Sequence, residues 1–129
     1  MRHLILMIDN EFEIPGLLRE RLTPTGFDVV WVNVQAVLTD QWLKKPTFGG
    51  IIVNLDMRDH AGMAVLERLQ KQRVDIPVIV ISSGLENGRL EEALRKGARD
   101  YVLKPIDTEL LLRKCLRHFG PPPSPTTGD

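Results

Sequence analysis

The chain has 129 residues, which is enough for one hydrophobic core and too short for two ordinary domains. Apolar residues make up 43% and charged residues 26%, a balance that excludes a membrane-spanning or intrinsically disordered chain. The 17 basic residues are matched by 17 acidic ones, so no net charge draws the whole molecule toward nucleic acid or anionic lipid.

The first half of the chain alternates short apolar runs with segments of helical period. Leu4–Ile8 predicts a first strand, and an apolar stripe from Ile14 to Leu22 predicts a helix that carries Pro15 in its first turn. Val29–Val32 predicts a second strand and Ile51–Val53 a third. Between these two strands, Ala36–Leu43 predicts a weakly marked helix.

The second half repeats this alternation. An apolar stripe from Val65 to Leu69 predicts a helix, and Val78–Ile81 predicts the fourth strand. The helix expected at Leu90–Leu94 should end at Gly97, because glycine readily adopts the left-handed conformation that follows a helix end. Tyr101–Leu103 predicts the fifth strand. A last helix carries the stripe from Leu111 to Phe119, with Asp107 or Thr108 as its N-cap.

Strands and helices that alternate five times indicate a doubly wound α/β fold with a parallel sheet. The strand segments are short and rich in Val and Ile, as expected for strands covered on both faces. We therefore predict a flavodoxin-like (βα)5 domain over residues 1–119, with strand order 2-1-3-4-5. The proline-rich residues 120–129 are expected to form a disordered tail or the start of a linker. The single cysteine, Cys115, and the absence of an export signal favour a cytoplasmic location.

Ligands of such folds bind at the carboxyl ends of the strands, which directs attention to the polar residues that follow each strand. These residues are Asp9 to Glu11, Asn54 to Asp56, Ser82 to Gly84, and Lys104 with Pro105. Together they resemble the response-regulator receiver domains (CheY-like family) of bacterial two-component signalling, and the similarity extends from about His3 to Phe119.

The resemblance implies roles for individual residues. Asp9 and Asn10 match the acidic pair that follows the first strand in the family. Ser82 matches the Ser or Thr that ends the fourth strand, and Tyr101 matches the aromatic residue that is reorganised when the domain is phosphorylated. Lys104 and Pro105 match the Lys-Pro pair that ends the fifth strand.

The position of the phosphoacceptor aspartate is decided by counting. In the family a methionine follows the acceptor by three residues and a glycine by eight. If Asn54 holds the acceptor position, Met57 and Gly62 occupy these two places. If Asp56 held it, the same places would contain Asp59 and Ala64. The better register therefore puts an amide where the family has its nucleophile, with Arg58 at the place of a family proline.

An amide at this position changes the chemistry that the resemblance implies. A carboxylate can attack phosphorus to form an acyl phosphate, whereas a neutral amide cannot. The metal site is weakened as well, because Mg²⁺ prefers anionic oxygen and Asn10 and Asn54 are both uncharged. Asp9 remains, and Asp56 or Glu11 could substitute, so we expect weak Mg²⁺ binding or none. We further expect Lys104 to pair with Asp9 and with the amide oxygens of Asn10 or Asn54.

The function that follows is a phosphorylation-independent interaction module in two-component (phosphorelay) signalling, not an enzyme. One alternative is a conventional phospho-accepting receiver that uses Asp56 with Mg²⁺, and another is a flavodoxin-like binder or enzyme outside signalling. The expected partner is a signalling protein, or a second copy of the chain, on the face of the fourth helix, fifth strand and fifth helix. That face is rich in basic residues: Arg95, Lys96, Arg99, Arg113, Lys114, Arg117 and His118. No membrane partner is expected, and nucleic acid only through an output domain outside this chain.

Overall fold

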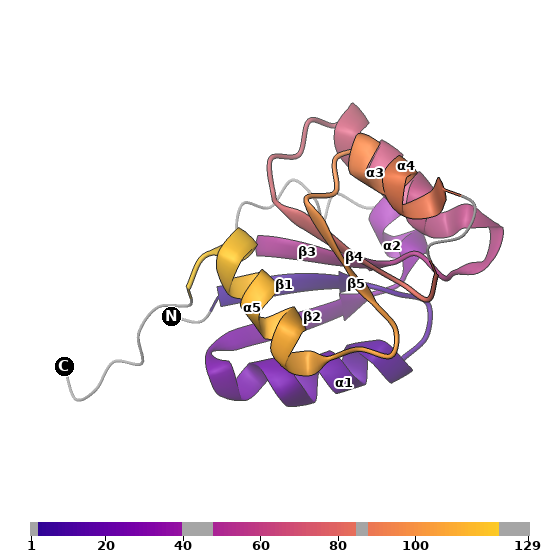
Figure 1. Ribbon diagram of the computed structural model, residues 1–129. Helices are drawn as coiled ribbons and strands as arrows, with labels where there is room; N and C mark the ends of the chain where they lie inside the picture. The colour runs from indigo at the N-terminus through magenta and orange to yellow at the C-terminus, as the bar shows by residue number, and fades with distance from the viewer. Residues whose placement is uncertain (1–2, 40–47, 85–87, 122–129) are drawn as a thin grey trace.

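The computed structural model describes residues 3–39, 48–84 and 88–121. Within these residues, five strands and five α-helices alternate along the sequence (Figure 1). The strands are β1 (His3–Ile8), β2 (Phe27–Val32), β3 (Phe48–Asn54), β4 (Val78–Ser82) and β5 (Asp100–Leu103). The helices are α1 (Glu13–Leu22), α2 (Val34–Thr39), α3 (Ala61–Lys71), α4 (Arg89–Arg95) and α5 (Thr108–Phe119), with short 3-10 turns at Thr23–Thr25 and Arg58–His60.

The strands form one parallel sheet in the order β2-β1-β3-β4-β5, which confirms the predicted fold and strand order. The register runs without interruption from His3↔Phe27 to Ile8↔Val32 between β1 and β2, and from Ile51↔Val78 to Asn54↔Ile81 between β3 and β4. Parallel pairing brings the carboxyl ends of all five strands to the same edge of the sheet.

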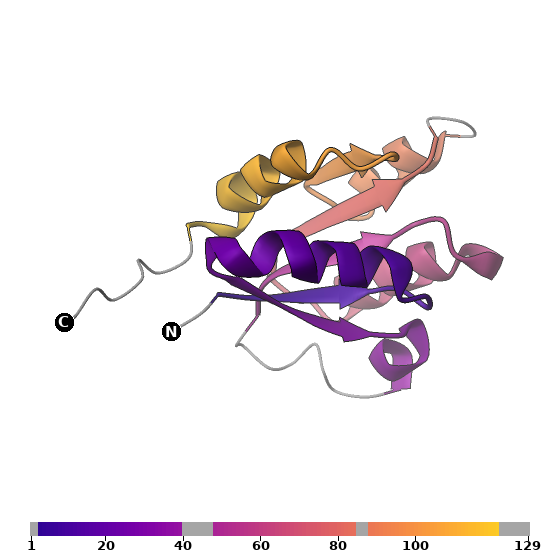
Figure 2. The same cartoon turned by 90° about the horizontal axis from the view of Figure 1, so that it is seen from below.

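Helices cover the sheet on both faces, so the domain has three layers (Figure 1). Because successive side chains of a strand point to opposite faces, Ile5 and Met7 of β1 join the core beneath α1 and α5. Leu6 and Ile8 join the other core, beneath α2, α3 and α4. Figure 2 shows α1 lying across the sheet with α5 beside it.

Local signals in the sequence explain most helix ends. Asp107 is the N-cap of α5, and its Oδ1 accepts hydrogen bonds from the N–H groups of Glu109 and Leu110. Gly97, just after α4, has a φ of 104°, a conformation that favours glycine. Pro15 lies in the first turn of α1, where its missing N–H leaves no helical hydrogen bond unmade.

Two predictions reach residues beyond the described part of the chain. The helix expected over Ala36–Leu43 is found at Val34–Thr39, and the remainder of the expected range lies outside the described residues. The predicted tail also lies outside the described residues beyond Pro121. Within residues 3–39, 48–84 and 88–121, no helix is long and apolar enough to cross a lipid bilayer.

Candidate functional site

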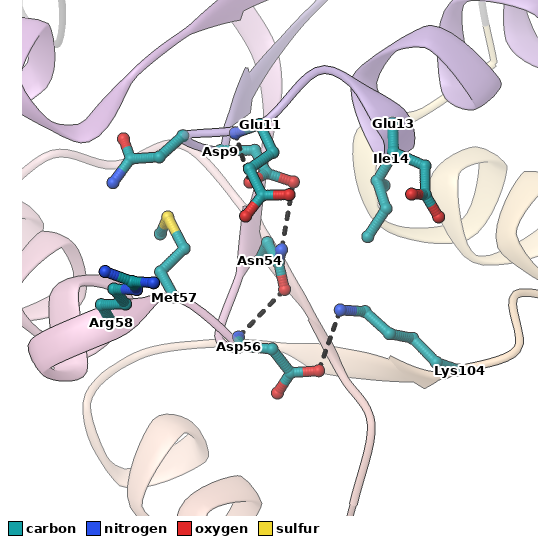
Figure 3. A pocket seen from close by; sticks show the side chains of 10 residues that line it. Asp9, Glu11, Glu13, Ile14, Asn54, Asp56, Met57, Arg58 and Lys104 are labelled. Carbon is teal, nitrogen blue, oxygen red and sulfur yellow. Dashed lines mark hydrogen bonds and ion pairs between the residues drawn. The ribbon is translucent and has the colours of Figure 1, made fainter.

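A cavity of about 380 Å³ opens where β1, β3 and β5 end (Figure 3). Charged and amide side chains dominate its wall. The lining residues are Asp9, Asn10, Glu11, Glu13, Ile14, Asn54, Asp56, Met57, Arg58 and Lys104. The sequence analysis placed its candidate residues at this edge of the sheet, and the structure brings Asp9, Asn10, Asn54, Asp56 and Lys104 together there.

Asp9 lies at the bottom of the site, with only 2% of its surface exposed. Its Oδ1 accepts a hydrogen bond from the N–H of Glu11 at 3.1 Å, and its Oδ2 accepts one from Asn54 Nδ2 at 3.0 Å. Burial raises the pKa of Asp9, and these hydrogen bonds together with the charge of Lys104 offset only part of that rise. Asp9 is therefore a buried carboxylate whose two oxygens are both engaged by groups of the chain itself.

Asn54 is the last residue of β3 and is 6% exposed. While its Nδ2 donates to Asp9, its Oδ1 accepts the N–H of Asp56 at 2.9 Å. The orientation of the amide is fixed by these two partners, because exchanging oxygen and nitrogen would lose both hydrogen bonds. The side chain thus bridges Asp9 and the loop after β3 without carrying a charge (Figure 3).

Gly62 provides a physical reason for the spacing that assigned Asn54. A Cβ at this position would lie 3.0 Å from the backbone oxygen of Asn54 and 3.1 Å from Leu55 Cα. Contacts this short would force backbone atoms to move. The close packing of the start of α3 against the end of β3 therefore favours glycine at position 62.

Asp56 follows two residues later and faces Lys104 directly. Lys104 Nζ lies 2.9 Å from Asp56 Oδ2, and the N–H of Ser83 donates to the same oxygen at 2.8 Å. Burial opposes ionisation of Asp56, but the hydrogen bonds from Lys104 and Ser83 outweigh it and hold the pKa of this carboxyl below its usual value. Asp56 is therefore ionised, and hydrogen bonds from the protein stabilise its negative charge.

The expected pairing of Lys104 with Asp9 and an amide oxygen was wrong. The ion pair is with Asp56, while Lys104 acts on Asp9 only through its charge at a distance. Both oxygens of Asp9 already have donors, and Asn54 Oδ1 is taken by the Asp56 N–H. The lysine therefore finds its free acceptor in the carboxylate of Asp56.

The arrangement does not fit a divalent cation. Asn10 Oδ1 accepts the N–H of Val34 at 2.9 Å, at the start of α2, and Asn54 presents a hydrogen-bearing nitrogen to Asp9 where a metal would need oxygen. The Asp56 carboxylate is bound to Lys104. In the described part of the chain no group of three or more His, Cys, Asp or Glu residues could hold a metal ion. The carboxylates of Asp9 and Asp56 are thus both satisfied by protein donors.

Ser82, Tyr101 and Pro105 occupy the places that the sequence indicated. Ser82 ends β4, is 1% exposed, and its Oγ donates to the backbone oxygen of Gly84 at 3.2 Å. Tyr101 of β5 is half-buried against the core beneath α3 and α4, and Lys114 Nζ lies 4.8 Å from the centre of its ring. Pro105 follows Lys104 through a cis peptide bond.

Much of the basic surface predicted over α4, β5 and α5 is paired within the domain. Lys96 contacts Glu67 at 3.1 Å, and both Lys114 and His118 lie 2.9 Å from oxygens of Asp100. Burial disfavours the charge of Asp100, yet the donors Lys114, Tyr101 N–H and His118 together lower its pKa. The exposed Arg95, Arg113 and Arg117 form no ion pair with another described residue.

Two further residues of the site carried no recognisable signal in the sequence. Arg89, the first residue of α4, places NH1 3.7 Å from Asp56 Oδ1. Trp31 of β2 donates its indole N–H to the backbone oxygen of Asp9 at 2.7 Å and so fixes the end of β1. An arginine that opens a helix and a tryptophan in a strand each have many ordinary roles, so neither could be assigned before the fold was known.

The five-stranded sheet and the strand-end cluster of acid, amide, serine and lysine define a receiver-type signalling fold. The sequence matches the response regulator receiver domain over residues 5–116, and the chain belongs to this family. As a receiver domain it is part of two-component signal transduction.

Curated relatives are longer proteins. The chain is 32% identical over 108 residues to the DNA-binding transcriptional regulator NtrC of Rhizobium meliloti (strain 1021), covering 83% of this chain and 22% of that protein. It is 27% identical over 117 residues to the transcriptional regulatory protein ZraR of Escherichia coli (strain K12), covering 88% of this chain and 26% of that protein. The chain therefore spans about a quarter of the length of these relatives.

Solved structures agree on the fold. The receiver domain of the Francisella response regulator 1452 superimposes with a TM-score of 0.79 over 92% of this chain and 97% of that one, at 21% identity. A sensor protein from Polaromonas sp. JS666 gives a TM-score of 0.78 at 27% identity, over 92% of this chain and 97% of that one.

Proposed function

We propose that this receiver domain acts as a phosphorylation-independent interaction module, without catalytic activity of its own. The proposal depends on one observation: Asn54, which we assign to the family's acceptor position from the spacing of the sequence, stands at the end of β3 with its amide nitrogen donating to Asp9. An amide nitrogen that is engaged in a hydrogen bond and conjugated to its carbonyl has no lone pair available to attack phosphorus. The domain would then signal through its shape and abundance.

The environment of Asn54 supports this proposal. In a phospho-accepting site a second carboxylate beside Asp9 would need a cation or a proton, because two anions in contact repel each other. The Asn54 amide removes that need by donating a hydrogen bond to Asp9. We propose that Mg²⁺ binds weakly or not at all, since the side chains that would hold it already bind protein donors.

The partner surface is proposed to be the face formed by α4, β5 and α5. Four large apolar side chains are exposed there by 36 to 42%: Leu94, Leu103, Leu110 and Leu116. Exposed leucines on neighbouring elements are typical of protein contact sites. The exposed arginines Arg95, Arg113 and Arg117 lie on α4 and α5 as well and favour a partner with an acidic surface, either a signalling protein or a second copy of the chain.

This surface has a direct test. Replacing Leu110 and Leu116 together with Ser should weaken binding to the partner, or self-association measured by sedimentation, by tenfold or more, on the order of 1.4 kcal/mol or greater. Because both side chains are already more than a third exposed, the urea midpoint should move little. Unchanged association would show that the contact lies elsewhere.

The main proposal is tested by phosphorylation with a small-molecule phosphodonor and MgCl₂, followed by intact-mass measurement. Wild-type protein should gain no phosphoryl group, whereas Asn54→Asp, which restores a carboxylate, should gain one. A stoichiometric gain by the wild type that disappears in Asp56→Asn would refute the proposal and establish Asp56 as the acceptor. That alternative draws support from Asp56 being an ionised carboxylate on the cavity wall beside Lys104.

The setting in the cell and in the full protein remains a prediction. We place the domain in the cytoplasm, where the kinases of two-component pathways act on receivers. Nucleic acid would be contacted only through an output domain of the kind that the longer relatives carry.

A further inference from the structure

Donor groups from three separate segments converge on the carboxylate of Asp56. Lys104, at the end of β5, and the N–H of Ser83, just after β4, both contact Oδ2 at 2.9 and 2.8 Å. On the other side Ser82 Oγ lies 3.5 Å and Arg89 NH1 3.7 Å from Oδ1. An ammonium and a backbone N–H that donate to one carboxylate, with a guanidinium facing its other oxygen, are the groups of an anion-binding site.

The anion in this site is a side chain of the domain itself. The backbone of Asp56 is fixed as well, because its N–H donates to Asn54 Oδ1 at 2.9 Å. Its side chain is 18% exposed and that of Lys104 25%, so the pair is better shielded than an ordinary surface ion pair. The carboxylate therefore joins the end of β3 to the ends of β4 and β5 and to the first residue of α4.

We propose that Asp56 is a resident anion that holds the α4, β5 and α5 face in a single arrangement without any covalent modification. This inference rests on the proposed function, since it supplies the means by which a module with Asn54 at the acceptor position keeps a defined binding face.

The path from Asp56 to that face is short. Lys104 directly follows Leu103, one of the exposed leucines, and the N–H of Lys104 donates to the backbone oxygen of Ser82 at 2.9 Å. Arg89 opens the helix that carries Leu94. Removing the carboxylate would leave Lys104 and the Ser83 N–H without their acceptor, and neutralising it would leave Lys104 and Arg89 without the negative charge that they face. In both cases the ends of β4 and β5 and the start of α4 would be held less firmly to β3.

Amide hydrogen exchange tests the inference, with two variants and a matched control. Asp56→Asn keeps the size of the side chain and removes its charge, and Asp56→Ala removes the carboxylate. Asp59→Asn changes an exposed aspartate three residues away whose φ of 57° suits asparagine. We expect the amides of Ser83 and Lys104 to exchange about tenfold faster or more in both Asp56 variants, and at the wild-type rate in Asp59→Asn.

Two further measurements separate a local effect from general instability and from loss of bulk. Amides of β1 should keep their wild-type rates, since a local loosening leaves the central strand protected. Sodium formate, a free carboxylate small enough for the space left by Asp56→Ala, should slow exchange at Ser83 and Lys104 again, and NaCl of equal ionic strength should not.

The outcomes are distinct. Unchanged exchange at Ser83 and Lys104 in both Asp56 variants would overturn the inference. So would faster exchange spread evenly over β1, or an effect in Asp56→Ala that formate fails to reverse. None of these experiments contains a phosphodonor, so the exchange rates are measured independently of phosphorylation. Phosphorylation of the wild-type protein would refute the proposed function, whereas the exchange rates test the role of Asp56.

Discussion

Replacing Asn54 by Asp should turn a self-sufficient site into one that depends on a cation. In the structure Asn54 Nδ2 donates to Asp9 Oδ2 at 3.0 Å, and both side chains are buried. The variant would place a second carboxylate at that distance. With an effective dielectric constant of about 20, two full charges at this separation repel each other by about 5.5 kcal/mol.

Proton uptake limits this cost. Protonating one carboxyl of ordinary pKa at pH 7 requires about 4 kcal/mol, so the destabilisation cannot exceed that value. Part of the repulsion is also relieved by the nearby positive charge of Lys104. We therefore expect the free energy of unfolding at pH 7 to fall by about 2–4 kcal/mol in the presence of EDTA.

The pH dependence has a definite sign. Burial already raises the pKa of Asp9, and a second carboxylate would raise the pKa of the pair further. A group with a raised folded-state pKa stabilises the fold at low pH and loses that contribution as the pH rises through the folded value. The penalty of Asn54→Asp should thus shrink toward pH 4 and grow toward pH 8.

Urea unfolding at both pH values, with and without MgCl₂, measures the effect. A divalent cation between the carboxylates should restore about 2.7 kcal/mol at a hundred times its dissociation constant. Asn33→Asp is the matched control, because Asn33 is an exposed residue whose Oδ1 accepts the N–H of Ala36, and aspartate serves equally well in that position. If Asn54→Asp is as stable as the wild type in EDTA and unaffected by MgCl₂, the reasoning about this pair is wrong.

Three further predictions follow from contacts around the site. Asp100→Asn should lower stability by about 1–2 kcal/mol at pH 7, and the difference should be smaller at pH 3. The reason is that a carboxyl whose pKa is lowered on folding stabilises the fold above its ordinary pKa of 3.8, and this contribution is lost as the pH falls through the lowered folded-state pKa. Urea titrations that give the same difference at both pH values would contradict this prediction. Gly62→Ala should destabilise the domain by about 1–3 kcal/mol, because the added Cβ would press on backbone atoms. Gly16→Ala in α1 should be neutral or stabilising, because its nearest contacts would be with the exposed ring of Phe12. Equal thermal midpoints for the two variants would contradict this prediction. Lys104→Met should lower the free energy of unfolding by about 1–3 kcal/mol, because it removes the ammonium group that contacts Asp56. The loss should be smaller when Asp56→Asn is already present, and additive effects in this double-mutant cycle would contradict an interaction between the two side chains.

The fold could be predicted because its signals are local and repeated. Val- and Ile-rich runs mark strands buried on both faces, and the parallel order follows from their alternation with helices. The assignment of Asn54 to the acceptor position stays a prediction; the close contact of Gly62 with Asn54 and Leu55 gives a physical reason for the spacing on which it was based. Even the choice left open between Asp107 and Thr108 as the cap of α5 concerned a single residue.

The pairing of Lys104 could not be predicted in the same way. Its side chain has four rotatable carbons and can reach any carboxylate near the end of β5. Which one it binds depends on where the loop after β3 places Asp56. That loop contains two consecutive residues with positive φ, Asp59 and His60; both residue types are enriched in this conformation, but the preference is too weak to locate it from sequence. The hydrogen bond of Asn10 could not be predicted either: Asn10 lines the cavity, but its Oδ1 accepts the N–H of Val34 at the start of α2.

The hydrogen bond between Asn54 and Asp9 also bears on how a cell would control such a module. A module of the proposed kind would need neither a divalent ion nor a high-energy phosphate donor, and would therefore be insensitive to fluctuations in both pools. Its output would follow the rate at which the protein is made and degraded, so that gene expression and proteolysis take over the role that kinase and phosphatase have for an ordinary receiver.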